Sequence, residues 1–130
     1  MIHLVRGLLK LVDKSGVYID SANPLQVTSS PKTFSTVTAP SRLVVGVVAS
    51  TILAVNPSRG LLLVQNVGLT IIYLSFGAVN PTASIYHIAL KPGLVVDDGL
   101  GAILISDEWI GAIQAISSAV GGAVVVTEGS

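Results

Sequence analysis

The chain has 130 residues, of which 51% are hydrophobic and 11% are charged, and its formal net charge at pH 7 is zero. A chain of this length predicts one compact domain, whereas an ordinary soluble domain is roughly a quarter charged. Part of the apolar surface is therefore expected to lie in interfaces between subunits. The absence of cysteine excludes disulfides and thiolate chemistry, and the neutral balance gives no general attraction to nucleic acid.

Residues 1–41 are predicted to form an N-terminal arm that begins with a short hairpin. Leu8–Val12 has the composition of a strand, Asp13–Gly16 that of a turn, and Val17–Ile19 that of a returning strand. A helix over the first dozen residues is the alternative, because apolar residues there also recur near helical spacing. Residues 28–41 are rich in Ser, Thr and Pro, which predicts a linker or a segment ordered only against a partner.

Residues 42–130 are predicted to form the body, an all-β, jelly-roll-like antiparallel β-sandwich. Short apolar stretches alternate with turns of Gly, Pro, Asn and Ser, about every eight to twelve residues. The predicted strands cover residues 43–55 (one strand, or two bent at Gly46), 61–66, 70–76, 85–90, 94–105 (one or two short strands around Asp97-Asp98-Gly99), 111–117 and 123–127. The charge-free run from Trp109 to Thr127 predicts two strands around a glycine turn and not a membrane helix, because polar residues interrupt it.

Several of the predicted strands are apolar on both faces. In residues 70–76, Ile72, Leu74 and Phe76 share one face, while Ile71 and Tyr73 share the other. One face belongs in the core of the subunit, and the second needs a cover of its own. This pattern predicts a homo-oligomer.

Several stretches of the chain resemble a β-sandwich domain of tailed-phage virion proteins. In the body they are Asn56–Arg59, Leu61–Asn66, Ile72–Gly77, Ile88–Gly93, Gly111–Ser117 and Val124–Glu128, and in the arm Leu11–Gly16 and Asn23–Val27 are similar to openings of phage head and fibre components. The resemblance implies a capsid decoration (cement) or head-fibre protein, commonly trimeric, with a jelly-roll body. A decoration protein on the exterior of the phage head that binds the major capsid protein is the expected function. A phage tail or fibre module that binds a host receptor or glycan is the alternative.

Ionisable side chains are too sparse to predict an enzyme, a metal site or a cofactor. A catalytic triad around His87 would need a nucleophile and a carboxylate that spacing does not identify. Asp97-Asp98 and Asp107-Glu108 offer oxygen ligands for calcium only if their loops meet, and they lack the spacing of a calcium-binding loop. No phosphate-binding or dinucleotide-binding motif occurs. Basic residues do not interleave with aromatics, so nucleic acid is not a predicted partner, and neither is a membrane.

The predicted contacts with capsid or neighbouring subunits are apolar and aromatic. They are Tyr18, Leu25, Val27, Phe34, Ile71, Tyr73 and Trp109. Trp109 is predicted either to anchor an interface or to plug the end of the core. Phe34 either docks on another subunit or folds back onto its own body. Residues 1–42 carry a net charge of +3 and residues 43–130 a net charge of −3, so a basic arm that docks onto the acidic body of a neighbouring subunit is a further alternative.

Overall fold

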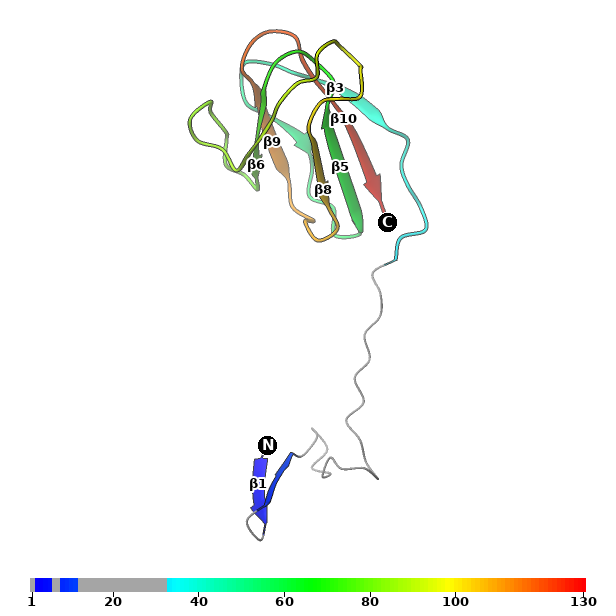
Figure 1. The fold of residues 1–130 in the computed structure, drawn as a ribbon, viewed down its shortest axis with the longest axis vertical. Coiled ribbons are helices and arrows are strands. Elements are labelled where there is room, and N and C mark those ends of the chain that lie inside the picture. The colour runs from blue at the N-terminus through cyan, green and yellow to red at the C-terminus, as the bar shows by residue number, and fades with distance from the viewer. Residues whose placement is uncertain (1, 6–7, 12–32) are drawn as a thin grey trace. The chain divides into compact units, whose positions relative to one another are not determined.

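A computed structural model describes residues 2–5, 8–11 and 33–130 (Figure 1). The chain divides into two compact units, Met1–Pro31 and Lys32–Ser130. The division falls earlier than the predicted boundary between residues 41 and 42. The reason is that residues 35–38 already pair with the C-terminus of the body, where Thr38 N donates to Glu128 O (2.8 Å) and Val37 forms a bridge with Gly129.

The first unit contains an antiparallel hairpin of β1 (Ile2–Val5) and β2 (Leu8–Leu11). Ile2 lies opposite Leu11, and Val5 lies opposite Leu8. The strand predicted from Leu8 is confirmed, but its partner is the preceding segment, and the alternative of a helix over residues 2–5 and 8–11 is wrong. These two segments match residue for residue, so each satisfies the other's backbone groups. The turn and return strand predicted over residues 13–19 lie outside the described residues.

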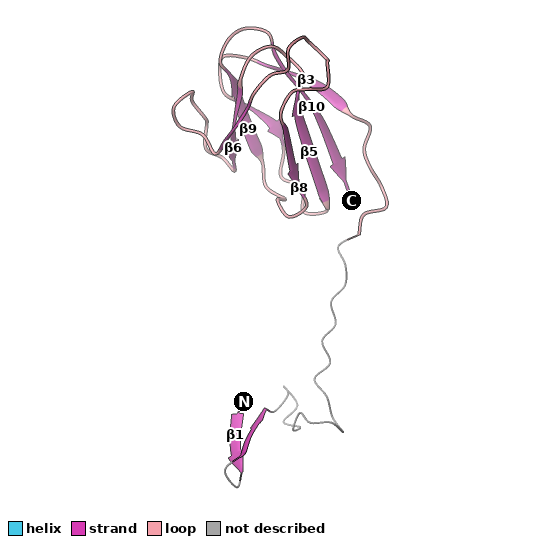
Figure 2. Cartoon of the chain, in the orientation of Figure 1, coloured by secondary structure: helices cyan, strands magenta, loops and turns pink. Residues whose placement is uncertain are grey.

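The second unit is a sandwich of two four-stranded antiparallel sheets (Figure 2), which confirms the predicted fold class. One sheet has the order β3 (Ser41–Val45), β10 (Gly122–Gly129), β5 (Leu61–Asn66) and β8 (Ile103–Ser106). The other has the order β4 (Ser50–Leu53), β9 (Ile113–Ser117), β6 (Ile72–Phe76) and β7 (Ile88–Leu90). Eight strands in this order, crossing between the two sheets, have the connectivity of a jelly roll.

The core lies between the sheets and is built from alternate residues of each strand. On β5, Leu62 and Val64 are fully buried, whereas Leu63 between them faces outward. On β6, Ile72 and Leu74 are fully buried, and Tyr73 points to the other face. The alternation predicted for Ile72, Tyr73 and Leu74 is confirmed. The other fully buried aliphatic residues are Val45, Ile113, Ala115 and Val124.

Two predicted strands are shorter in the structure, and a third divides. Residues 43–55 form two separate strands, β3 and β4, which is the predicted alternative of two strands bent at Gly46. Of residues 85–90 only Ile88–Leu90 is a strand. Of the one or two short strands predicted within residues 94–105, one forms as Ile103–Ser106, and residues 94–96 form none. The Asp98 carboxylate accounts for the second case, because it accepts hydrogen bonds from the amides of Leu94 (2.7 Å) and Leu100 (2.8 Å) and folds the intervening residues into a turn.

Candidate functional site

Four loops meet at the end of the sandwich opposite the C-terminus (Figure 1). They are residues 46–49, 67–71, 91–102 and 118–121. Backbone hydrogen bonds join them: Ser117 N donates to Gly46 O (2.8 Å), and Ser118 N donates to Ile71 O (2.9 Å). Asp97 N donates to Val67 O (3.1 Å). The loops therefore form one continuous end surface.

Exposed aliphatic side chains cover this end. They are Val47, Val48, Leu69, Leu94, Val95, Val96, Leu100 and Val120, and we refer to them together as the apolar tip. Val120 and Leu94 are the most exposed, at 87% and 84%. Single exposed aliphatic residues are ordinary on a protein surface, but eight of them on four joined loops form the kind of patch that marks an interaction site.

The loop of residues 91–102 is held in one conformation by Asp98. Its Oδ2 accepts from the amides of Leu94 and Val95, at 2.7 and 3.0 Å, and its Oδ1 accepts from the amide of Leu100. Hydrogen bonds from the Val95, Leu100 and Leu94 amides hold the pKa of the Asp98 carboxyl below its ordinary value. Four of the eight residues of the apolar tip thus stand on a fixed turn.

Two further contacts fix the same loop across the end of the first sheet. Asp97 forms an ion pair with Arg42 on β3. Gln65 on β5 donates from its side-chain amide to the carbonyls of Gly99 (3.1 Å) and Gly101 (3.2 Å). The loop is therefore attached to strands at both the edge and the middle of the sheet, so the aliphatic side chains it carries are presented by a rigid support.

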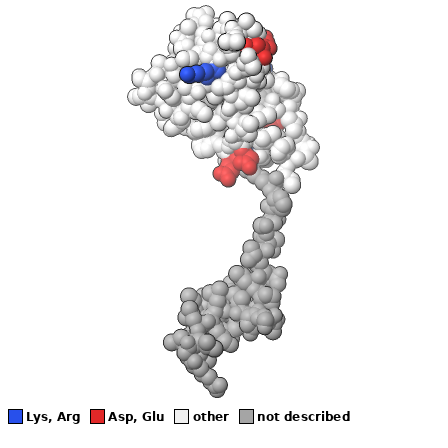
Figure 3. Space-filling view, viewed as in Figure 1, with Lys and Arg blue, Asp and Glu red and all other residues white. Residues whose placement is uncertain are grey.

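The outer face of the β3–β10–β5–β8 sheet is largely aliphatic. Its outward aliphatic residues are Val44, Leu63, Ile103, Ile105 and Val125, which we refer to as the aliphatic face, and Arg42, Gln65 and Thr127 point outward among them. Leu63 lies directly opposite Ile105 in the sheet. Figure 3 shows that most of the body surface in that view carries neither acidic nor basic side chains.

The outer face of the other sheet is largely covered by its own chain. The rings of Tyr73 and Tyr86 lie 4.8 Å apart. Gln114 accepts from the Thr51 hydroxyl (2.9 Å) and donates to the carbonyl of Gly77 (3.3 Å). The predicted interface residue Tyr73 is thus half-buried against the loop between β6 and β7. The polar side chain of Gln114 lies on the same face of the sheet.

Trp109 lies in the loop between β8 and β9, where it closes one end of the core and also lines a cleft. Its indole Nε1 donates to Ala112 O (3.1 Å), and its ring meets the Phe76 ring edge-on at 5.2 Å. The cleft has a volume of about 400 Å³ and is lined by Phe76, Ser106, Glu108 and Trp109. Trp109 therefore closes the end of the core, and its position in the wall of the cleft leaves the role of interface anchor a prediction.

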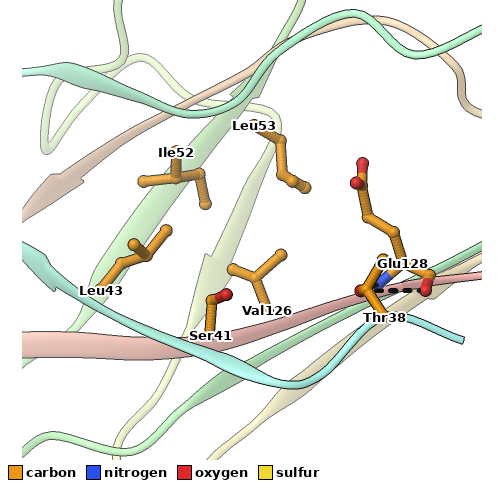
Figure 4. Close-up of a pocket in the computed structure, with 7 residues that line it drawn as sticks. All are labelled: Thr38, Ser41, Leu43, Ile52, Leu53, Val126 and Glu128. Atoms are coloured by element: carbon orange, nitrogen blue, oxygen red, sulfur yellow. Dashed lines mark hydrogen bonds between the residues drawn. The ribbon is translucent and has the colours of Figure 1, made fainter.

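A second cleft opens between the two sheets at the β3 and β4 edges (Figure 4). Ile52 and Leu53 of β4 face Leu43 and Val126 across it, with hydroxyl groups at the rim. Its volume is about 190 Å³, and its walls combine four apolar side chains with Thr38, Ser41 and Glu128.

Arg59 has a structural position that the sequence left open. It is 4% exposed, and its guanidinium pairs with the Glu128 carboxylate, with Nε 2.7 Å from Oε1. It also donates to the carbonyls of Ala54 (2.8 Å) and Gly111 (2.9 Å). Arg59 therefore satisfies backbone carbonyl groups of other segments of the body and is not a solvated turn charge.

The structure places the predicted interface residues in different surroundings. Tyr18, Leu25 and Val27 lie outside the described residues. Phe34 is 43% exposed and lies against Gly60 and Gly129. This is the alternative in which Phe34 folds back onto its own body. Sequence reasoning missed the apolar tip because its members were assigned to strands or passed over in turns. The sequence feature that could have predicted the apolar tip is the presence of aliphatic side chains within segments that have the composition of turns.

The described residues offer little for other kinds of site. Within residues 2–5, 8–11 and 33–130, no three His, Cys, Asp or Glu side chains gather where a metal ion could bind. His87 accepts a hydrogen bond at Nδ1 from the amide of Phe76 (2.9 Å), which is a structural role. Over the same residues no helix has the length and apolar character needed to cross a membrane.

Comparison with known proteins gives one weak likeness. No family model and no curated protein matches the sequence. A solved chain from the structure described as "Bacillus endospore appendages form a novel family of disulfide-linked pili" is similar, with 13% sequence identity and a TM-score of 0.39. The alignment covers 81% of this chain and 98% of that chain.

Proposed function

We propose that this chain is a structural virion protein that decorates and stabilises the assembled phage head. The observation that carries the proposal is the apolar tip, a rigid aliphatic surface at one end of a jelly roll. Jelly rolls recur in viral capsids, although an architecture alone does not assign a function. The resemblance of the body to phage virion domains gives the proposal its setting.

In the proposed mechanism the apolar tip docks onto the major capsid protein at the outer surface of the head. Aliphatic surface removed from water stabilises the contact by about 25 cal/mol for each Å² buried. Because the protein binds the assembled lattice and not the dissociated subunits, it stabilises the lattice by mass action. Three copies joined as a trimer would attach together, and each attachment would raise the effective concentration of the next.

The test is binding of purified protein to phage heads assembled without it. Val48→Lys and Val120→Lys each place a charge in the apolar tip, and each is expected to weaken binding about tenfold or more, because a charge resists burial in an apolar contact. Ile85→Lys is the matched control, because Ile85 is 69% exposed on the loop between β6 and β7, away from the tip. Binding by both tip variants at the wild-type level would refute the proposal.

The cleft beside Trp109 favours a second candidate, a module that binds a glycan. An indole ring next to a carboxylate is suited to a sugar ring and its hydroxyl groups. Trp109 is the single tryptophan of the chain, so its fluorescence reports on this cleft alone. Soluble glycans are expected to change that fluorescence in the wild type and to do so more weakly in Glu108→Ala. No change with any glycan removes this candidate.

A further inference from the structure

Each sheet of the body ends in two edge strands, and three of the four edges carry features that block pairing with another strand. β3 contains the charged Arg42 and follows Pro40. The register of β4 shifts between Thr51 and Leu53, which twists the edge. β7 has only three residues and runs directly into Lys91-Pro92. Charges, proline, short strands and irregular register are the means by which proteins protect sheet edges.

The fourth edge, β8, is four residues long and has no charge, proline or register shift within it, and Asp107 and Glu108 follow it. Its register with β5 is regular from Leu62 opposite Ser106 to Gln65 opposite Ile103. Residues 99–106 contain no ionisable side chain and no proline. Ile103 and Ile105 point outward and are 51% and 65% exposed. Among the described residues β8 pairs only with β5, so the backbone groups along its other side are available to another strand.

We propose that β8 is an assembly edge that pairs antiparallel with β8 of a second copy of this chain. The pairing would join two four-stranded sheets into one continuous sheet across the two copies. It would also bring the Ile103 and Ile105 margins of the two aliphatic faces together across the two copies.

The sequence of β8 is self-complementary in one register. When Leu104 lies opposite Leu104 of the second copy, Ile103 lies opposite Ile105 and Ala102 lies opposite Ser106. Each pair then shares a face of the sheet, as cross-strand pairing requires. The outward pairs are both Ile with Ile, and the inward pair at the centre is Leu with Leu. A contact of this kind is two-fold symmetric.

Charge favours the antiparallel arrangement over the parallel one. Asp107 follows β8 directly, so parallel pairing in register would place the two Asp107 carboxylates side by side. In the antiparallel register Asp107 lies opposite Gly101 of the other copy, and Glu108 lies opposite Leu100. Like charges directly opposite one another destabilise a sheet, so the antiparallel pairing avoids a repulsion that the parallel pairing creates.

The first test is the molar mass of the purified chain by light scattering, without phage heads. Ile105→Lys is expected to halve the mass of the wild-type assembly, because an edge lysine blocks pairing. The mass halves whether the assembly is a dimer or a pair of trimers. Ile85→Lys, a substitution at a similarly exposed isoleucine, is expected to leave the mass unchanged. An unchanged mass for Ile105→Lys, or an equal loss for Ile85→Lys, overturns the pairing.

A second test reads the register and does not depend on the lysine variant folding. The chain has no cysteine, so introduced thiols are the only ones present. Ile103→Cys mixed with Ile105→Cys is expected to form an intermolecular disulfide, because directly opposed Cβ atoms lie about 4.5–5.5 Å apart. Each variant alone should cross-link far less. Equal cross-linking in all three samples overturns the register. Both tests use free protein, so their results do not depend on attachment to the capsid. Ile105→Lys should still bind phage heads.

Discussion

At the scale of single residues, Arg59 shows how one side chain joins parts of the body that are distant in sequence. It follows the turn after β4, yet its guanidinium reaches the carbonyl of Gly111 and the carboxylate of Glu128 on β10. The side chain of Glu128 is 23% exposed, so water screens this ion pair only in part. Five fixed donors in one plane match this set of acceptors, which lysine does not.

We expect Arg59→Ala to lower the free energy of unfolding by about 3–5 kcal/mol, the usual cost of breaking a buried ion pair from one side. Arg59→Lys should recover part of this loss, because it restores the charge but not the bonds to the separate carbonyls. Urea unfolding of both variants measures the difference. A loss below about 1 kcal/mol for Arg59→Ala would show that water replaces the guanidinium without difficulty.

At the scale of elements, the turn of residues 94–100 depends on one carboxylate. Asp97 adopts a positive φ of 60° and Gly99 one of 74°, so the backbone folds tightly around Asp98. A protonated carboxyl is a weaker acceptor for the amides of Leu94, Val95 and Leu100 than a carboxylate. The presentation of half of the apolar tip is therefore linked to the ionisation of Asp98.

The order of this turn should fall in acid. The pKa of Asp98 is lowered in the folded protein, so its contribution is fully present above the ordinary carboxyl pKa of about 3.9 and is lost as the pH falls through the lower folded-state pKa. The amide proton shifts of Leu94, Val95 and Leu100, followed by NMR from pH 7 downward, should move together with a midpoint below that ordinary value. In Asp98→Asn this shared transition should be absent.

The same elements show where sequence reasoning succeeds. Residues 61–66 are bounded by the Asn56–Gly60 turn on one side and by Gly68 on the other, and these turns with the apolar run between them predict the strand that β5 forms. Local pattern is enough there, because neighbouring turns and burial agree. The Leu94-Val95-Val96 run has equal strand propensity, but the Asp98 carboxylate captures its amides, and propensity does not include that contact.

The apolar tip could not be predicted in the same way. Val48, Leu69 and Val120 are far apart in sequence and come together only because the jelly-roll connections bring their loops to one end. Sequence reasoning located the surplus of apolar surface and inferred an interface from it. It placed that surplus on the face of Tyr73, which the loop between β6 and β7 largely covers.

At the scale of the whole molecule, the body should fold without residues 1–32. Residues 33–40 should stay, because the Ser35 and Thr36 amides both donate to Ser130 O, at 3.0 and 2.9 Å. Thermal unfolding should therefore show little change on deletion of residues 1–32. Deletion of residues 1–40 should cost roughly 1–3 kcal/mol through these and neighbouring hydrogen bonds. If the shorter deletion also abolishes binding to phage heads, the arm and not the tip is the attachment.

The two modes of attachment also differ in their response to salt and temperature. Attachment to the head through the basic arm would be an electrostatic contact, so raising the salt from 0.1 M to 1 M, which shortens the screening length from about 10 Å to about 3 Å, should weaken it. Docking through the apolar tip should hardly respond to salt, but it should show a clearly negative heat-capacity change on binding. Calorimetric titration of phage heads at two temperatures and two salt concentrations separates the modes. Strong salt dependence with a heat-capacity change near zero would contradict attachment through the tip.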